Sequence, residues 1–242
     1  VDKIRVHADT IGVVIGSPAR NPRKEGKDLF NAAFFLYEQQ IIAEIHKTLL
    51  PTYDVFDEYR YFEPADTWQV VPFKGKKIAV TICEDIWNLG DNPLYKICPM
   101  DQLMQQSPDF MVNLSASPFD YTHDEDRKAT IKANVVKYKL PMFYCNAVGS
   151  QTEIVFDGAS YAFDKAANLC GALPMFTESV QGFDLHEDGS IAQAILEPAS
   201  RVPDKELNPV TLEAELNIAQ VYDALVLGIR DYFGKMGFTK AI

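Results

Sequence analysis

The stretch Lys77-Ile-Ala-Val-Thr-Ile82 runs directly into Cys83-Glu-Asp-Ile-Trp87, and this junction decides the fold class. A short apolar run rich in β-branched residues predicts a buried strand. Asp91-Asn92-Pro93 then has the composition of a helix start, so we expect a helix to open there. Cys83 is therefore expected at the carboxyl end of a strand, just before a turn or helix.

A second unit of the same kind follows. The strand predicted for Asp109-Phe-Met-Val-Asn-Leu114 ends in Ser115-Ala-Ser-Pro118. Thr122 and Glu125 have the spacing of a capping box, for a helix that reaches about Tyr138. A strand followed by a helix, twice, predicts an α/β (α+β) layered fold.

The flanking segments favour strands. Short runs of β-forming residues lie before and after the two units, at 12–16, 33–37, 40–45, 69–73, 141–145, 161–163, 169–170 and 191–196. The later runs are expected to complete a mostly antiparallel flank of the sheet. The polar stretch 197–209 contains three prolines and precedes an amphipathic helix predicted from Leu212 to about Phe233. We therefore expect a domain over 1–200 and a linker with its helix over 201–242.

Composition narrows the function classes. The formal charge is −11 and no basic stripe is visible, so nucleic acid and anionic membranes are disfavoured as partners. No apolar run approaches the roughly 18 to 20 residues that span a bilayer. The four cysteines form no C-x-x-C pair and follow no secretory segment, so neither a disulfide framework nor a metal site is indicated. We expect a cytoplasmic protein.

Two residues stand out chemically. A cysteine at a strand end can expose its sulfur while the next backbone N–H, that of Glu84, faces a developing oxyanion. Lys47 lies in an otherwise apolar segment, His46-Lys-Thr-Leu-Leu-Pro51, where burial of its charge requires a partner. The alternatives are an ordinary buried thiol at Cys83 and a surface lysine at Lys47.

Together these segments resemble the carbon–nitrogen hydrolase, or nitrilase, family, whose active site combines a glutamate, a lysine and a cysteine. Lys47-Thr-Leu-Leu-Pro51 is similar to the lysine motif, and Thr81-Ile-Cys-Glu-Asp-Ile-Trp87 is similar to the cysteine motif. Residues 50–62 and Asn113-Leu-Ser-Ala-Ser-Pro118 look most like the glutaminase domains of NAD synthetases. The helix at 219–233 resembles the linker helix that precedes the ATP-binding synthetase domain of that family.

The resemblance implies an α-β-β-α sandwich that lacks its first strand and helix. It places the family's catalytic glutamate, in a Pro-Glu context, ahead of residue 1. Glu63-Pro64 reverses that order and is not assigned as the base. If the chain were the whole molecule, its glutaminase activity should be severely impaired, because that glutamate would be missing.

Carried over residue by residue, the resemblance implies that Cys83 attacks the glutamine carboxamide, that Lys47 stabilises the oxyanion or holds the cysteine, and that Glu58 is a second, positioning glutamate. Residues implied to contact substrate or oxyanion are Tyr53, Glu84, Trp87 and Ser117, with Ser115 as a rival for Ser117, and His123 where some relatives carry arginine. Core packing for Tyr53 and Trp87 and a surface position for Glu58 remain open alternatives.

The implied function is a glutamine amidohydrolase that releases ammonia through a cysteine thioester. An absent synthetase domain would use that ammonia to amidate deamido-NAD, and ATP and magnesium are expected only there. Glutamine, the chain's own synthetase domain and further copies in a homo-oligomer are the expected partners. A non-catalytic nitrilase-like scaffold, a free-standing amidase, and a Cys-His hydrolase that pairs Cys83 with His46 or His123 are the alternatives.

Overall fold

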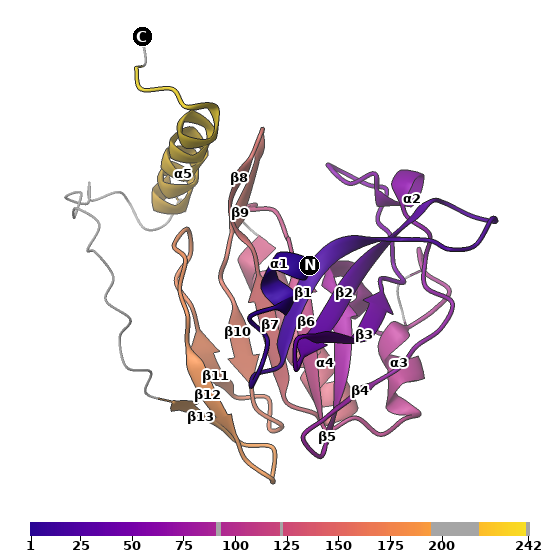
Figure 1. Ribbon diagram of the computed structural model, residues 1–242. Helices are drawn as coiled ribbons and strands as arrows, with labels where there is room; N and C mark the ends of the chain where they lie inside the picture. Colours follow the sequence, from indigo (N-terminus) through magenta and orange to yellow (C-terminus); the bar gives the residue numbers. More distant parts are fainter. Residues whose placement is uncertain (91–92, 122, 195–217, 241–242) are drawn as a thin grey trace.

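The computed structural model describes residues 1–90, 93–121, 123–194 and 218–240. Its centre is a six-stranded sheet with the strand order β11-β10-β7-β6-β5-β4 (Figure 1). Strands β5, β6 and β7 are parallel, and β4, β10 and β11 pair antiparallel at the flanks. The bounds are β4 (Val71–Phe73), β5 (Lys76–Ile82), β6 (Phe110–Ser115), β7 (Met142–Asn146), β10 (Tyr161–Phe163) and β11 (Leu169–Ala172). The strands predicted for these segments are thus present, with an antiparallel flank. Ile191–Ala194, predicted for the same flank, instead pairs in a separate two-stranded sheet.

A three-stranded antiparallel sheet packs face to face on this sheet. It consists of β1 (Val13–Arg20), β2 (Leu29–Tyr37) and β3 (Gln40–His46). Phe35 and Ile45 meet Val80 and Ile82 of β5 in the layer between the two sheets. The alternation of side chains along a strand places these residues on one face, so burial of that face fixes the register.

Helices cover the opposite face of the six-stranded sheet. They are α3 (Pro99–Met104) and α4 (His123–Tyr138). Ile131 and Val135 of α4 pack on Met111 and Met142 of the sheet in a fully buried cluster. On the far side of the three-stranded sheet lies the short helix α1 (Asp2–Arg5), beside a small cluster of buried side chains. The layers are therefore helix, sheet, sheet, with a short helix outside.

Two hairpins and the last helix complete the described residues. The hairpins are β8 (Val148–Gln151) with β9 (Ile154–Asp157), and β12 (Gly182–Leu185) with β13 (Ile191–Ala194). Helix α5 (Ile218–Met236) lies beside the β8–β9 hairpin (Figure 1). The Asp231 carboxylate accepts a hydrogen bond from the backbone N–H of Ser150 at 2.8 Å, and the Lys235 ammonium donates to the Ser150 carbonyl.

The mixed α/β class is confirmed, and one helix start is wrong. The helix expected from Asp91-Asn92-Pro93 begins instead at Pro99, where a proline suits the first turn because its missing N–H would have no helical partner. Asp91 and Asn92 themselves, the Thr122 cap, the predicted linker at 197–209 and the predicted helix start at Leu212 lie outside the described residues. The domain boundary at residue 200 stays a prediction. No helix among the described residues has the length and hydropathy needed to cross a membrane.

Candidate active site

Cys83 is the first residue of the short 3-10 helix η1 (Cys83–Ile86), at the sharp turn where β5 ends. Its φ is +45°, in the left-handed region that costs a residue with a side chain roughly 1–2 kcal/mol. Strained strand-to-helix turns of this kind project a nucleophile out of the sheet. Cys83 lines a cavity of about 360 Å³, together with the predicted residues Tyr53, Glu84, Trp87 and Ser117.

Lys47 is 1% exposed and is paired. Its Nζ lies 2.6 Å from Oε1 of Glu58, which begins the short helix α2 (Glu58–Tyr61). The amide of Asn31 donates to the other Glu58 oxygen at 3.1 Å. Burial lowers the pKa of Lys47, but the charges of Cys83 and Glu58 outweigh it, and the net pKa is raised. The sequence expectation of a buried, partnered lysine is met, with Glu58 as the partner.

The same charges act on the thiol. Burial raises the pKa of Cys83, and the positive charge of Lys47 and the Ser115 hydroxyl lower it in part. The carboxylates of Glu58 and Glu84 raise it further. Lys47 is therefore the cation that favours a thiolate here, and its pairing with Glu58 moderates that effect.

Asp85 ties the lysine segment to the cysteine turn. Its buried carboxylate accepts hydrogen bonds from three backbone N–H groups, those of Thr48, Leu49 and Ile82, at 2.9 to 3.1 Å. Burial raises the pKa of Asp85 to about 6 against the lowering effect of these bonds. Sequence reasoning did not assign this residue. The adjacent acidic residues Glu84 and Asp85, with apolar residues on both sides, were the available signal, because a buried carboxylate must find donors.

Glu84 is a buried carboxylate at the cavity wall. Its Oε1 accepts hydrogen bonds from the Tyr53 hydroxyl at 2.9 Å and the Tyr95 hydroxyl at 2.7 Å. Burial and the Glu84 charge raise the pKa of both tyrosines, so both hydroxyls remain donors. Tyr95 was missed, because nothing in its local sequence distinguishes it. Glu84 is thus a fixed negative group facing the cavity.

The remaining predicted residues separate into two groups. Trp87 and Ser117 line the cavity with Cys83. Ser115, at the end of β6, has a buried hydroxyl that acts on the Cys83 thiol, and it is not part of the cavity lining. His123 begins α4, but its side chain lies outside the description.

His46 makes its contacts elsewhere. Its Nε2 lies 2.8 Å from Glu44 Oε1, and its ring stacks on Phe30 with centroids 3.8 Å apart. Neither contact involves Cys83, so the described geometry gives no support to a Cys83–His46 pair. Within the described part of the chain, no group of three or more His, Cys, Asp or Glu side chains is placed to hold a metal ion.

Known proteins are similar to this chain in sequence and in fold. No protein-family model matches it. A glutamine-dependent NAD(+) synthetase from Synechocystis sp. is 35% identical over 241 residues, covering 96% of this chain and 40% of the relative. One from Thermotoga maritima is 32% identical, covering 89% of this chain and 40% of the relative.

Solved structures agree. The glutamine-dependent NAD+ synthetase of Acinetobacter baumannii is 28% identical with a TM-score of 0.74, over 94% of this chain and 38% of that structure. A nitrilase-superfamily amidase from Nesterenkonia, 18% identical with a TM-score of 0.57 over 72% of this chain and 60% of its own, shares the fold. The chain spans about two fifths of the length of the curated relatives it matches. Over nearly its whole length the chain is homologous to a segment of glutamine-dependent NAD(+) synthetases.

Proposed function

We propose that this chain carries a glutamine amidohydrolase site with Cys83 as its nucleophile. The observation that carries the proposal is the meeting of three features around one thiol. Cys83 lies at a strained turn and lines the cavity, the charges of the buried Lys47–Glu58 pair act on its thiol, and Glu84 lines the same cavity. A nucleophile, a fixed cation and a substrate-orienting group are the components of acyl transfer.

In the proposed reaction the Cys83 sulfur attacks the carboxamide carbon of glutamine. The thiol proton goes to the leaving nitrogen, ammonia departs, and a glutamyl thioester remains on Cys83. Water then hydrolyses the thioester to glutamate and restores the thiol. Lys47 and the backbone N–H of Glu84 are assigned to the negative oxygen of the tetrahedral intermediate. Glu58 holds Lys47 in place.

Substrate orientation is assigned to the cavity wall. Glu84 is a buried carboxylate whose two tyrosine donors fix its direction, and it suits the α-ammonium group of an amino acid. Ser117 and Trp87 supply a hydroxyl and an apolar face. A negative group in the wall of this cavity favours a free amino acid amide over a simple uncharged amide.

The released ammonia is proposed to serve a synthetase region of the same protein. The matched relatives are glutamine-dependent NAD(+) synthetases, and this chain corresponds to about two fifths of their length. ATP and magnesium are assigned to that other region, and no cofactor is assigned to the described site. Association into a homo-oligomer is part of the same proposal.

The test is an ammonia-release assay on the full-length gene product. Glutamine, asparagine and acetamide are compared in the unmodified protein, in Cys83→Ala and in Cys170→Ala, which alters a cysteine outside the cavity. We expect release from glutamine that Cys83→Ala abolishes and Cys170→Ala retains. Equal release from acetamide would favour a general amidase, and glutamine binding without release would favour a scaffold.

A further inference from the structure

Arg127 is a buried cation that the proposed chemistry does not use. It lies in the first half of α4 and is 1% exposed. One guanidinium nitrogen is 3.0 Å from Oδ2 of Asp157, which is itself 1% exposed. Desolvation of two charges costs several kcal/mol, so such a pair is weak evidence for stability alone. The contacts of this ion pair therefore indicate what it does.

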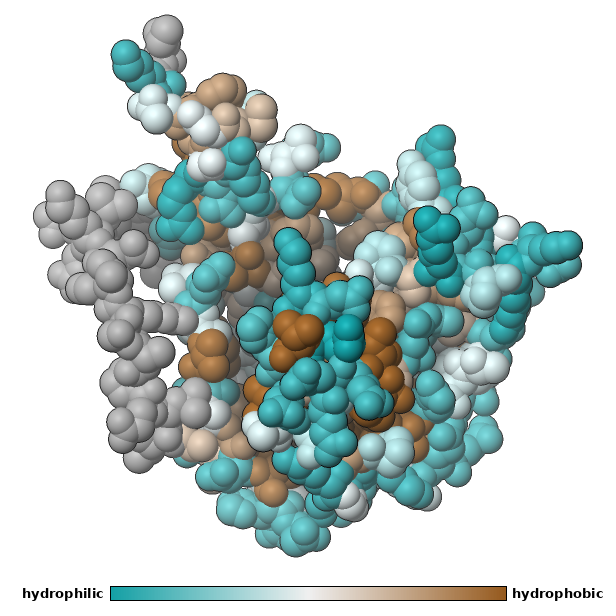
Figure 2. Space-filling view, in the orientation of Figure 1, coloured by the Kyte–Doolittle hydropathy of each residue, from teal (hydrophilic) through white to brown (hydrophobic). Residues whose placement is uncertain are grey.

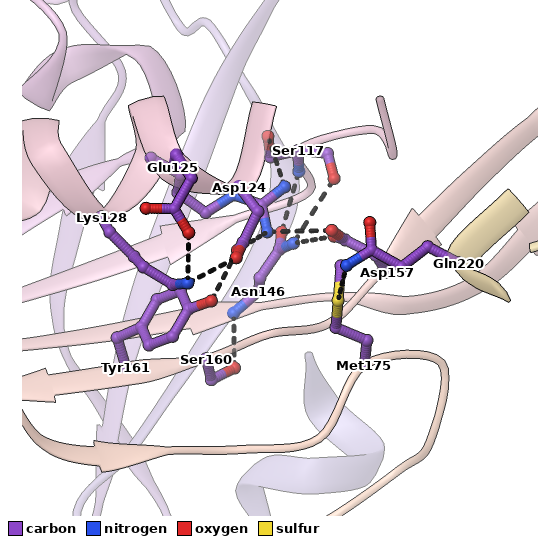
Figure 3. Close-up of polar contacts among 11 residues, drawn as sticks. Ser117, Asp124, Glu125, Lys128, Asn146, Asp157, Ser160, Tyr161, Met175 and Gln220 are labelled. Atoms are coloured by element: carbon purple, nitrogen blue, oxygen red, sulfur yellow. Dashed lines mark hydrogen bonds and ion pairs between the residues drawn. The ribbon is translucent and has the colours of Figure 1, made fainter. Parts of the chain in front are cut away.

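The pair leads to Ser117 by two routes, and Figure 3 labels the residues of the route through Asp157 and Asn146. The other guanidinium nitrogen of Arg127 lies 3.4 Å from the Ser117 hydroxyl. Asp157 Oδ1 accepts a hydrogen bond from the Asn146 amide at 3.0 Å, and Asn146 Oδ1 accepts one from the Ser117 backbone N–H at 2.8 Å. Both the main chain and the side chain of Ser117 are therefore held.

Backbone contacts hold the residues that follow Ser117 against strand β9. The Phe119 backbone N–H donates to the Val155 carbonyl at 2.7 Å, and Pro118 forms a bridge with Phe156. Strand β9, which ends at Asp157, also supplies Ile154 and Val155 to the cavity. The ion pair thus lies directly behind the wall that Ser117 shares with β9.

The donor and the acceptor of the Arg127–Ser117 hydrogen bond are fixed by their chemistry. A guanidinium has donors only, so the Ser117 oxygen must accept from Arg127. The Ser117 O–H then remains available as a donor, and Ser117 lines the cavity. A donor at that point suits an acceptor on the substrate, such as a carboxylate or carbonyl oxygen.

We propose that Arg127, Asp157 and Asn146 are positioning residues that fix Ser117 as a hydrogen-bond donor to an acceptor oxygen of the substrate. The inference rests on the proposed glutamine hydrolysis and adds a group of residues that acts through Ser117. Because these residues do not touch the reacting atoms, their loss should weaken glutamine binding and raise KM more than it lowers kcat.

The test is a double-mutant cycle in the full-length gene product. Ser117→Ala, Arg127→Lys and the double variant are compared for kcat and KM on glutamine. Lysine keeps a charge for Asp157 but cannot span Asp157 and Ser117 as a planar fork does. We expect each single variant to raise KM about tenfold, the size of one lost hydrogen bond to a charged group. The double variant should be no worse than either single one.

Asp157→Asn is a second test variant in case Arg127→Lys does not fold. It is nearly isosteric with the original side chain and removes the negative charge. Asp66→Asn is the matched control, since the exposed Arg23–Asp66 pair lies outside the cavity lining. Thermal unfolding is recorded for each protein. Additive KM effects, or an unchanged KM in folded Arg127→Lys and Asp157→Asn, overturn the positioning role while leaving the hydrolysis intact. Absence of glutamine hydrolysis in the unmodified protein overturns the proposed function, and the positioning role with it.

Discussion

The Lys47 ammonium lies 2.6 Å from the Glu58 carboxylate, and the two residues hold opposite influences over one thiol. The positive charge of Lys47 lowers the pKa of Cys83, and the negative charge of Glu58 raises it. Burial raises that pKa above its ordinary value. The reactivity of Cys83 is thus set by a balance that substitution of either partner should shift in a known direction.

Removal of the cation should suppress the thiolate. Lys47→Met takes away the charge that lowers the Cys83 pKa, so the pKa rises and a smaller fraction is ionised at pH 8. Removal of the anion, by Glu58→Gln, should lower the pKa and raise that fraction. Each pKa unit changes the thiolate population about tenfold below the pKa. The thiolate fraction in each variant is measured by the rate of iodoacetamide labelling at Cys83. The rate is followed from pH 6 to 10 by peptide mass spectrometry. Rate changes in the same direction for the two variants would contradict the charge balance.

The positive φ of Cys83 predicts an unusual preference for glycine. At most buried positions replacement of alanine by glycine destabilises a protein by roughly 0.5–1 kcal/mol. At Cys83 the order should reverse, with Cys83→Gly about 1 kcal/mol more stable than Cys83→Ala, because glycine adopts φ +45° freely. Urea unfolding of the two variants measures the difference. Ala79→Gly, within β5, is the control and should lose stability. A less stable glycine variant at Cys83 would mean that the turn is unstrained.

Asp85 predicts a large loss of stability on truncation. Asp85→Ala would leave three buried backbone N–H groups without their acceptor, at about 1–3 kcal/mol each. Asp85→Asn retains an oxygen for Thr48 and Leu49 and should cost less. Asp109→Ala, which removes one bond at an exposed site, is the comparison and should cost about 1 kcal/mol. Equal unfolding midpoints for Asp85→Ala and Asp109→Ala would argue against the anchoring role.

Tyr95 should influence substrate binding without touching the cavity. Tyr95→Phe removes one of the two hydroxyl donors that fix Glu84. A lost hydrogen bond to a carboxylate is worth about 1.5–3 kcal/mol, so the KM for glutamine should rise tenfold or more. Steady-state ammonia release in the full-length gene product measures this, beside Tyr222→Phe on the exposed face of α5. An unchanged KM in a folded Tyr95→Phe variant would show that the Tyr95 hydroxyl does not orient Glu84 for glutamine binding.

Local pattern was enough to predict the scaffold. The apolar run before Cys83 identified β5, because a strand buried on both faces has no polar alternation. The start of α3 was misplaced, because Asp91-Asn92-Pro93 and Cys98-Pro99 are both acceptable helix starts and packing of Met100 and Leu103 on the core selects the second. The apolar surroundings of Lys47 predicted its burial correctly.

The supporting contacts of the site could not be predicted in the same way. Asp85 reaches the segment after Lys47 across more than thirty residues, and Tyr95 reaches Glu84 around the turn that follows η1. Arg127 and Asp157 are thirty residues apart and meet only because α4 and β9 converge behind Ser117. These contacts depend on tertiary packing, which leaves no periodic signal in the sequence. The family resemblance indicated the cavity residues but not the groups behind them.

The glutamyl thioester proposed on Cys83 can be trapped. The full-length gene product is mixed with isotopically labelled glutamine, quenched in acid within milliseconds to seconds, and digested for mass spectrometry. We expect a labelled glutamyl group on the peptide that contains Cys83, which hydroxylamine removes and which is absent from Cys83→Ala. Ammonia release that continues in Cys83→Ala, or a glutamyl group on a different residue, would contradict the proposal.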